Sequence, residues 1–427
     1  MTKGSDSENA FRITKISKDE RMDILFAKSS LPYILYFISF FSAKRLQLLK
    51  PSMYRKMEKL LTKLCCYLFR SNYRPDSNIF EFDGEPDYHR QKILRELNII
   101  NYLTELISRP FDRGLFDIKL LKENMLITRI LAMSYTTIKY IIRENRSNEL
   151  YCSQWLNLFL EHSLKTKGRR EIMAEKTLTE LIDNNKRILT DKIERGTVNK
   201  FIQLVSEDKV AKYIEILRVI IICNGKPLTG NQREISQLLL KDDKMRNRLM
   251  YKLRLDQGKQ LVQVCFEMNG EEWFDLETLS TKTLLMSYLG NSVFDYFVSF
   301  TFLLGDLCMK RNYKAIETLQ EFIPFNICYN IVTHENYPIR VKEAFTYLMI
   351  ALWVDVAPLQ KRLMPDHIKF WDLNGGLSMH GNRLVEKREQ CERLKLEVIN
   401  YLTSVQEHQF YEEEDIRFMI MMLKLLK

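Results

Sequence analysis

Hydrophobic residues recur along this chain with the period of an α-helix. Between positions 90 and 107, Ile93, Leu97, Ile100, Thr104 and Ile107 fall on one helical face. The spacing predicts an all-α fold. The other segments with helical spacing are Leu121–Ile142, Ser153–Leu164, Ala174–Asn184, Val198–Ser206, Lys209–Cys223, Gln232–Leu240, Thr281–Leu289, Val293–Arg311, Asn312–Glu321, Phe325–Thr333, Ile339–Val354, Glu386–His408 and Glu413–Leu423.

Short breakers separate these segments at regular intervals, among them Arg109-Pro110, Asn145–Ser147, Asn224–Pro227 and Tyr337-Pro338. A helical pair about every 40 residues is typical of armadillo and HEAT arrays, in which each pair presents an apolar face to the next. We therefore predict an armadillo/HEAT-like α-solenoid of helical pairs. Because internal sequence similarity is weak, this prediction rests on spacing and not on a repeat motif.

One segment has the period of a β-strand. Lys259–Met268 alternates between polar and apolar residues, and Asn269-Gly270 separates it from a second short run, Glu271–Leu276. Asn-Gly between extended runs favours a type I′ turn, because both residues tolerate positive φ. We predict one short β-hairpin near 260–276.

The hairpin is a natural place to divide the chain. We expect a mobile N-terminal tail over 1–20, N-terminal helices over 21–83, the α-solenoid over 84–258, the β-hairpin over 259–276 and a second helical lobe over 277–427.

The composition agrees with long helices and few tight turns. Gly (14) and Pro (10) make 24 of 427 residues, about half the usual share, too few for a β-sandwich or a Gly-rich nucleotide-binding fold. Hydrophobic residues (46%) can build a sizeable core. Leu31–Phe41 is much shorter than the ~20 apolar residues that a bilayer requires, and two aspartates interrupt Val293–Met309. We expect no transmembrane segment in this chain.

The charged and reactive residues give little indication of chemistry. The net charge of +10 is spread along the chain, as on solvated helix faces, and without a zinc finger or an RNA-binding motif we expect no nucleic-acid binding. The eight cysteines form no CxxC motif, so we expect reduced core thiols, with disulfides as the alternative, and no metal site. Catalytic and nucleotide-binding motifs are absent, so we predict no enzyme, no catalytic residue and no cofactor. An enzyme whose catalytic residues converge from distant parts of the sequence remains the alternative, because local motifs do not show such a site.

The clearest candidate site begins the first strong helix. Tyr88, Lys92 and Arg95 are spaced i, i+4 and i+7, so they share one face, roughly opposite the apolar stripe. Two cations and a phenol on one ridge can hold a phosphate through charge-assisted hydrogen bonds. An ordinary polar face is the alternative, and spacing alone favours it.

These residues also resemble the start of the homology domain shared by ryanodine receptors and inositol trisphosphate receptors. The order and spacing of the matching blocks agree over about 84–373. The first block comprises Arg90–Ile100, Arg109–Phe111, Asn145–Asn148, Ala174–Leu178, Asp183–Ile188, Cys223–Pro227, Asn231-Gln232 and Leu238–Leu240. The second comprises His334–Pro338, Arg340, Ala344-Phe345, Leu348-Met349, Trp353–Asp355, Pro358, Gln360, Pro365 and Trp371.

The resemblance implies a helical solenoid from the cytosolic assembly of an intracellular calcium-release channel. In inositol trisphosphate receptors this domain supplies one wall of the ligand cleft, and a β-trefoil supplies the other. Of the family's Arg-x-x-x-Lys-x-x-Arg contacts, Lys92 and Arg95 match and Tyr88 replaces the first Arg. Of a later Tyr-Arg-Lys trio, only Arg146 is present, which is more similar to ryanodine receptors. No β-trefoil precedes the domain in this sequence.

Our leading hypothesis is a non-enzymatic regulatory or scaffold solenoid that relays ligand or partner binding to a pore not present in this chain. Its partners would be channel subunits or other proteins on the solenoid surface. We expect a cytoplasmic location, at the cytosolic face of the endoplasmic reticulum if the chain is part of a channel. The chain is either a fragment of a receptor or a free-standing relative. The alternative is a soluble inositol-phosphate (anion) binding module that uses Lys92, Arg95 and Arg146.

The missing contacts predict weak ligand binding. A charged hydrogen bond to phosphate contributes ~1.5–3 kcal/mol. Loss of several such contacts weakens binding by powers of ten, because about 1.4 kcal/mol is tenfold. We expect isothermal titration calorimetry to detect no sub-micromolar binding of inositol trisphosphate to this chain. Sub-micromolar binding that Lys92→Ala or Arg95→Ala abolishes would contradict this prediction.

Overall fold

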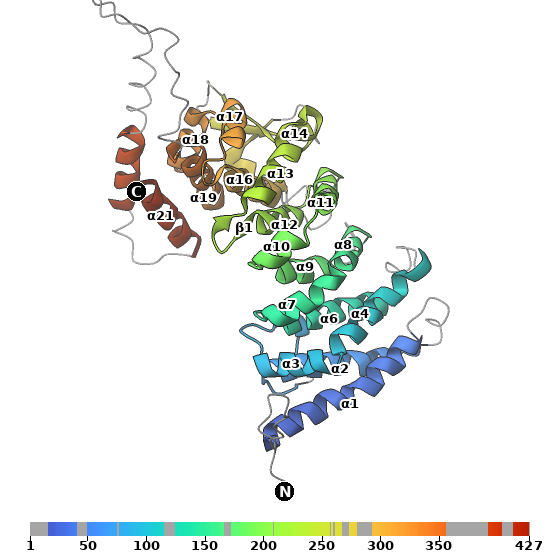
Figure 1. Cartoon of the computed structure of the whole chain (residues 1–427). Coiled ribbons are helices and arrows are strands. Elements are labelled where there is room, and N and C mark those ends of the chain that lie inside the picture. Colours follow the sequence, from blue (N-terminus) through green and yellow to red (C-terminus); the bar gives the residue numbers. More distant parts are fainter. Residues whose placement is uncertain are drawn as a thin grey trace, which may run out of the picture. The chain divides into compact units, whose positions relative to one another are not determined.

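The computed structural model describes residues 16–40, 49–74, 77–114, 124–165, 172–207, 209–256, 258, 261–266, 273–279, 293–355, 392–403 and 413–426. Helices dominate the described residues (Figure 1), and two small antiparallel sheets accompany them, so the predicted all-α fold class is confirmed. The chain forms two compact units, Met1–Ile188 and Leu189–Lys427. The five-segment division predicted from the sequence stays a prediction.

Unit 1 is built from helices and short 3-10 turns. They are α1 (Lys18–Phe40), α2 (Pro51–Leu68), η2 (Ile79–Glu81), α3 (Tyr88–Glu96), α4 (Ile99–Ser108), η3 (Arg109–Gly114), α6 (Met125–Ile142), α7 (Arg146–Cys152), η4 (Ser153–Trp155), α8 (Leu156–Lys165) and α9 (Ala174–Ile182). Helix α10 (Lys186–Asp191) contains the boundary between the two units in the sequence.

Helix α6 is the core of unit 1, packed against α2, α4 and α9. Most of its side chains are buried, which accounts for its apolar composition. Among the described residues it is also the one helix long and apolar enough to cross a membrane, but 78% of that stretch is buried inside the unit. Its hydrophobicity is therefore accounted for by packing.

The periodic stretch from 90 to 107 forms two helices instead of one. Helix α3 ends at Glu96 and α4 begins at Ile99. Between them Asn98 adopts the left-handed region (φ 58°), which Asn tolerates better than most residues. Hydrophobic spacing continued through the break, so periodicity alone did not show it.

The C-terminal end of α6 has every backbone carbonyl paired. Its last four carbonyls belong to residues 139–142, and a helix leaves these groups without partners of its own. The backbone N–H groups of Arg143 and Asn145 donate to the carbonyls of residues 139 and 142, respectively. The side-chain amide of Gln91 donates to the carbonyl of residue 140 (2.9 Å), and that of Asn148 donates to the carbonyl of residue 141 (2.8 Å).

Gln91 is itself fully satisfied. Its amide nitrogen also donates to the Arg143 carbonyl (2.7 Å), and its amide oxygen accepts from the Asn145 side chain (3.0 Å). The side chain is almost completely buried. One residue of α3 thus closes the end of α6 and the turn into α7.

Unit 2 contains the remaining elements. Its helices are α11 (Arg195–Glu207), α12 (Ala211–Ile221), α13 (Thr229–Leu240), α14 (Asp243–Leu249), η6 (Leu276–Thr278), α16 (Val293–Cys308), α17 (Tyr313–Phe322), α18 (Phe325–Thr333), α19 (Ile339–Met349), the π-helix η7 (Ile350–Val354), a helix over 392–403 and α21 (Glu413–Leu426). Helix α16 is the core, in contact with α12, α13 and α19.

The end of α16 repeats the arrangement found at α6. The backbone N–H groups of Met309 and Asn312 donate to the carbonyls of residues 305 and 308, respectively. The Gln232 side chain donates to the carbonyl of residue 306 (2.9 Å) and to that of Met309 (3.0 Å). The Asn312 side chain donates to the carbonyl of residue 307 (3.0 Å). We call Gln91 with Asn148, and Gln232 with Asn312, the two amide clamps.

Close packing of α16 against α19 depends on Gly305. A Cβ at this position would lie 2.6 Å from the Tyr347 ring, so the ring approaches the helix only over a glycine. The Tyr347 hydroxyl donates to buried Asp306 (2.6 Å), which also accepts from Arg218 of α12 (2.7 Å). Burial raises the pKa of Asp306, although both donors lower it.

The predicted hairpin is present as part of a three-stranded sheet. Strands β4 (Leu261–Cys265) and β5 (Trp273–Asp275) pair antiparallel, as expected, while Asn269-Gly270 lies outside the described residues. The sequence analysis missed β3 (Lys252–Asp256), which pairs with β4 on its other side. Lys252–Asp256 also alternates polar and apolar residues, so the signal was present in the sequence.

A second hairpin was interpreted from the sequence only as a helix breaker. Strands β1 (Ile222–Cys223) and β2 (Lys226–Pro227) flank Asn224-Gly225, and both turn residues have positive φ (50° and 68°). These angles are those of a type I′ turn, the conformation that Asn-Gly favours.

Seven cysteines lie in the described part of the chain, and all are buried thiols that form no disulfide with one another. Burial raises the pKa of the Cys65 thiol to about 12 and that of Cys328 to about 12. The expectation of reduced core thiols is met at these positions, and Cys391 lies outside the described residues.

Replacement of Gln91 by Leu should destabilise unit 1. The variant keeps a similar side-chain size but leaves two buried carbonyls and one amide without partners, at ~1–3 kcal/mol each. We expect a loss of at least about 3 kcal/mol in the free energy of unfolding, measured by urea denaturation followed by circular dichroism.

Gln154→Leu is the matched control in the same unit. Its amide donates to the Tyr151 carbonyl (2.8 Å), but the pair is exposed and water can replace the bond. We expect a change within about 0.5 kcal/mol. Equal stability of the two variants would contradict the structural role of Gln91.

Candidate functional site

Helix α3 carries the first two candidate residues, Lys92 and Arg95. The Asp87 carboxylate caps the helix by accepting from the Arg90 N–H (2.9 Å). Tyr88 and Lys92 are exposed, whereas Arg95 has only 20% of its side chain accessible. The predicted ridge is therefore divided, with Tyr88 and Lys92 facing solvent and Arg95 turned toward α7.

Arg95 is held by two neighbours. Its guanidinium donates to the Asn148 side chain of α7 (3.0 Å) and to the Glu96 carboxylate (2.8 Å). The hydrogen bond from Arg95 lowers the pKa of Glu96, and the charge of Lys92 adds to this shift. Asn148 belongs to an amide clamp, so the clamp also fixes the direction of Arg95.

Arg146 begins α7 and is also paired. It donates to the Glu149 carboxylate (2.7 Å) and to the Asp183 carbonyl (3.3 Å). Glu149 is buried and accepts from the Asn185 side chain as well (2.6 Å). Burial raises the pKa of Glu149, although both donors work in the opposite direction.

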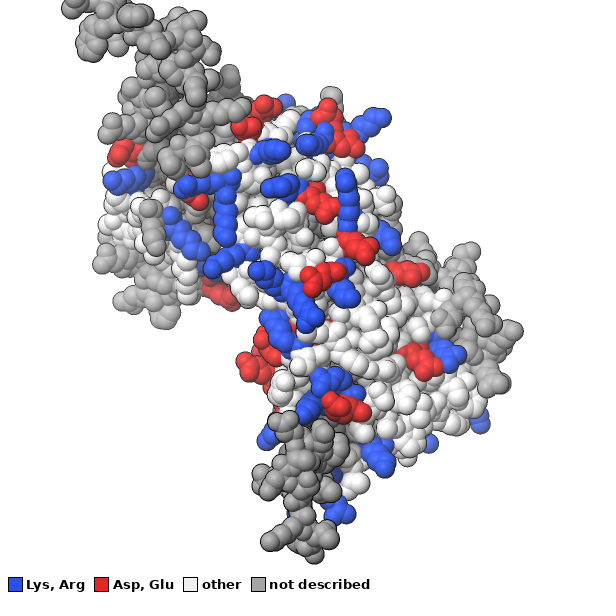
Figure 2. Space-filling model, viewed as in Figure 1, with Lys and Arg blue, Asp and Glu red and all other residues white. Residues whose placement is uncertain are grey.

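The structure places the three candidate residues on two adjacent helices but does not leave three available cations. Arg95 and Arg146 each have an acidic partner, and Figure 2 shows basic and acidic side chains side by side in the region of α3 and α7. Within the described part of the chain, Lys92 has no recorded hydrogen bond or ion pair. The assignment of Lys92, Arg95 and Arg146 as phosphate contacts stays a prediction.

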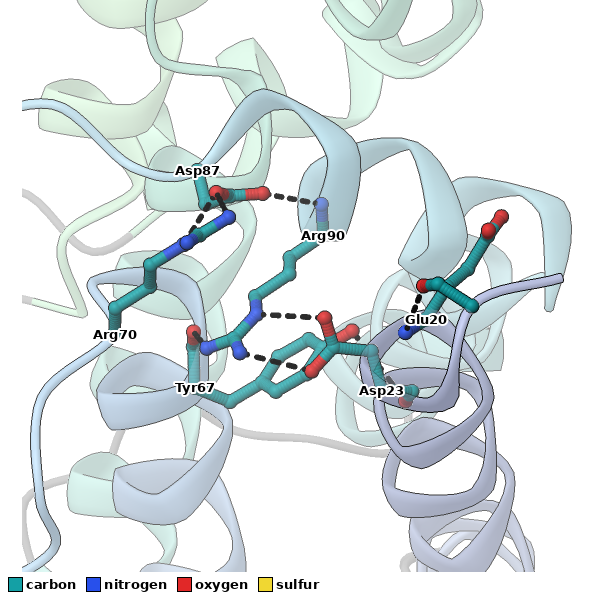
Figure 3. A network of polar contacts seen from close by, with 7 residues as sticks. Glu20, Asp23, Tyr67, Arg70, Asp87 and Arg90 are labelled. Atoms are coloured by element: carbon teal, nitrogen blue, oxygen red, sulfur yellow. Dashed lines mark hydrogen bonds and ion pairs between the residues drawn. The ribbon is translucent and has the colours of Figure 1, made fainter.

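A second group of charges, at the start of α3, holds three helices together (Figure 3). The Arg90 guanidinium donates to both carboxylate oxygens of Asp23 in α1 (3.1 and 2.9 Å). It also donates to the Tyr67 carbonyl of α2 (2.8 Å) and lies 4.7 Å from the centre of the Tyr67 ring. Arg70 donates to Asp87 (2.6 Å). The sequence analysis did not identify this network, because its members are up to 67 residues apart.

Asp87 accepts hydrogen bonds from the Arg70 side chain and the Arg90 backbone N–H. Burial works against its charged form, but the Arg90 N–H and the Arg70 guanidinium outweigh it, and the pKa of Asp87 is lowered. Each cation in Figure 3 thus has an acidic partner, and the network is structural.

No group of three His, Cys, Asp or Glu side chains suited to a metal ion occurs among the residues that the structure describes. In unit 2, a polar hollow of about 410 Å³ is bordered by Arg218, Arg340 and Arg417. Arg218 pairs with Asp306, Arg340 with Asp295, and Arg417 with acids that include Glu343. These guanidinium groups have acidic partners too.

Residues 58–252 match the family model of the RIH domain. The chain is 22% identical to inositol 1,4,5-trisphosphate receptor-like protein A of Dictyostelium discoideum over 276 residues, which are 65% of this chain and 8% of that protein. It is 21% identical to the inositol 1,4,5-trisphosphate receptor itr-1 of Caenorhabditis elegans over 367 residues, which are 81% of this chain and 12% of that receptor.

The chain thus contains a RIH domain, the homology domain of ryanodine and inositol trisphosphate receptors, and the resemblance seen in its sequence is confirmed. The second block of resemblance, from His334 onward, lies beyond the RIH match. The chain spans about a tenth of the length of these two relatives.

Proposed function

We propose that this chain is a non-enzymatic regulatory or scaffold module that works in the cytoplasm as part of, or beside, a calcium-release channel. Its RIH domain and its receptor relatives relate it to the cytosolic region of such channels. In this proposal the stacked helices form an armadillo-like solenoid. Binding of a ligand or partner at one place shifts the helices together, and the shift reaches a pore carried elsewhere.

The amide clamps are the observation that supports this function best. Each clamp ties the end of a core helix to a side chain from a helix far away in the sequence, as Gln91 ties α3 to α6. Movement of one helix must then move its neighbour or break buried hydrogen bonds, at ~1–3 kcal/mol per unpaired group. Such coupling suits a module that transmits displacement.

A soluble inositol-phosphate or anion binder is the second candidate. The exposed, unpaired position of Lys92 beside Tyr88 favours it. The ion pairs of Arg95 and Arg146 oppose it, since an anion must compete with Glu96 and Glu149 for them. Each competition reduces the gain from a charge-assisted hydrogen bond.

Disruption of the gene in its own organism tests the proposal. We expect calcium release from the stores of permeabilised cells, triggered by inositol trisphosphate, to change in amplitude or threshold. Re-expression of the wild-type chain should restore it. Unchanged release after gene loss would contradict a role at the channel.

The two candidates differ in how a charge-removed variant behaves. A Lys92→Ala/Arg95→Ala/Arg146→Ala variant should restore release if the module acts mechanically. Failure of this variant, with normal expression and thermal stability, would favour the anion binder instead. A Lys200→Ala/Lys241→Ala/Lys244→Ala variant, altered on the exposed faces of unit 2, is the control for lost charge.

A further inference from the structure

Helix α1 exposes an apolar stripe along its length. Met22 (58% exposed), Leu25, Tyr33 (64%) and Tyr36 (56%) lie on one side at helical spacing. A different side of the helix, with Ile34, is buried against the rest of unit 1. Contiguous apolar surface of this kind marks interaction sites.

The C-terminal half of the stripe borders a hollow of about 360 Å³ between α1 and α2. Phe37 and Met57 are buried beneath it, and Tyr33, Tyr36 and Met53 stand around it. Methionine side chains adapt to the shape of an incoming apolar group, and aromatic walls supply large contact area. In its volume and in the residues around it, the hollow suits apolar side chains.

Helix α2 places basic residues beside this hollow. Lys56 borders it, and Lys59 and Lys63 continue the same face at i+3 and i+7, with Arg55 next to them. The Nζ atoms of Lys59 and Lys63 lie over the Tyr73 ring, 5.7 and 5.6 Å from its centre, respectively.

These four cations have no recorded acidic partner in the described residues. The acidic residue of α2, Glu58, is occupied by Arg129 (3.1 Å). The face therefore combines an apolar hollow with uncompensated positive charge on one border.

We propose that the α1–α2 hollow binds an amphipathic helix whose apolar side chains enter it and whose polar side is acidic. Helices that dock in this way use apolar anchors at i, i+3 or i+4 and i+7, matching the stripe on α1. Carboxylates on the docked helix would meet Lys56, Lys59 and Lys63, which gives orientation and faster association.

Two other occupants fit less well. A membrane surface cannot enter a concave hollow. A second copy of this chain offers α21, whose exposed stripe contains Ile416, Ile420 and Leu423. Its acidic residues lie only in the first turn, where Glu413 and Glu414 pair with Arg417, and its last turn carries Lys424, so it offers no acidic face along its length to meet the basic border. Charge therefore favours an acidic helix from another protein.

The test uses the full chain and two synthetic 18-residue peptides with leucines at the anchor positions, one with glutamate and one with lysine at the polar positions. Binding is measured by fluorescence anisotropy. We expect the glutamate peptide to bind at least about tenfold more tightly than the lysine peptide, with an affinity that falls as salt is raised.

Two variants locate the binding site. We expect Lys56→Glu/Lys59→Glu/Lys63→Glu and Tyr33→Ser/Tyr36→Ser each to weaken binding of the glutamate peptide by about tenfold or more. Lys200→Glu/Lys241→Glu/Lys244→Glu, with the same change in net charge on unit 2, should leave binding within about twofold. All altered side chains in the tyrosine variant are exposed, so folding should be retained.

Several results would overturn the proposal. They are equal affinity for the two peptides, binding that neither variant at the α1–α2 hollow weakens, capture by anionic phosphatidylserine vesicles without peptide binding, and self-association in sedimentation velocity that the tyrosine variant abolishes.

Discussion

The structure depends on the need to pair the backbone carbonyls at the ends of its two core helices. Helices α6 and α16 end inside their units, where water cannot donate hydrogen bonds to the terminal carbonyls. A carbonyl left unpaired there is costly. Both units meet this need in the same way. A glutamine from another helix spans two carbonyls, and an asparagine near the start of the next helix takes a third.

This shared solution gives physical meaning to the resemblance in the sequence. Gln91, Asn145, Asn148 and Gln232 all lie in the blocks that resemble the receptor family, and all of them close helix ends. The resemblance is therefore carried by residues that build the fold at least as much as by residues that could touch a ligand. A chain can keep the helical framework while its candidate phosphate contacts are replaced or paired, as Arg146 is with Glu149.

Local sequence predicted the elements better than their junctions. The helix expected over Phe325–Thr333 has those bounds in the structure, because a proline precedes it and apolar spacing runs through it. The break at Asn98 was missed because hydrophobic spacing continued through it. The partners of Arg95 and Gln91 were out of reach, since they lie 53 and 49 residues away, a distance that no local pattern covers.

Hydrogen exchange tests the central role of the clamps most directly. In a Gln232→Leu variant of the full chain, measured by mass spectrometry, we predict faster exchange at the end of α16 and in α13 and α17, with unit 1 unchanged. Those segments are the ones that Gln232 and Asn312 join. Protection equal to wild type throughout unit 2 would contradict the account.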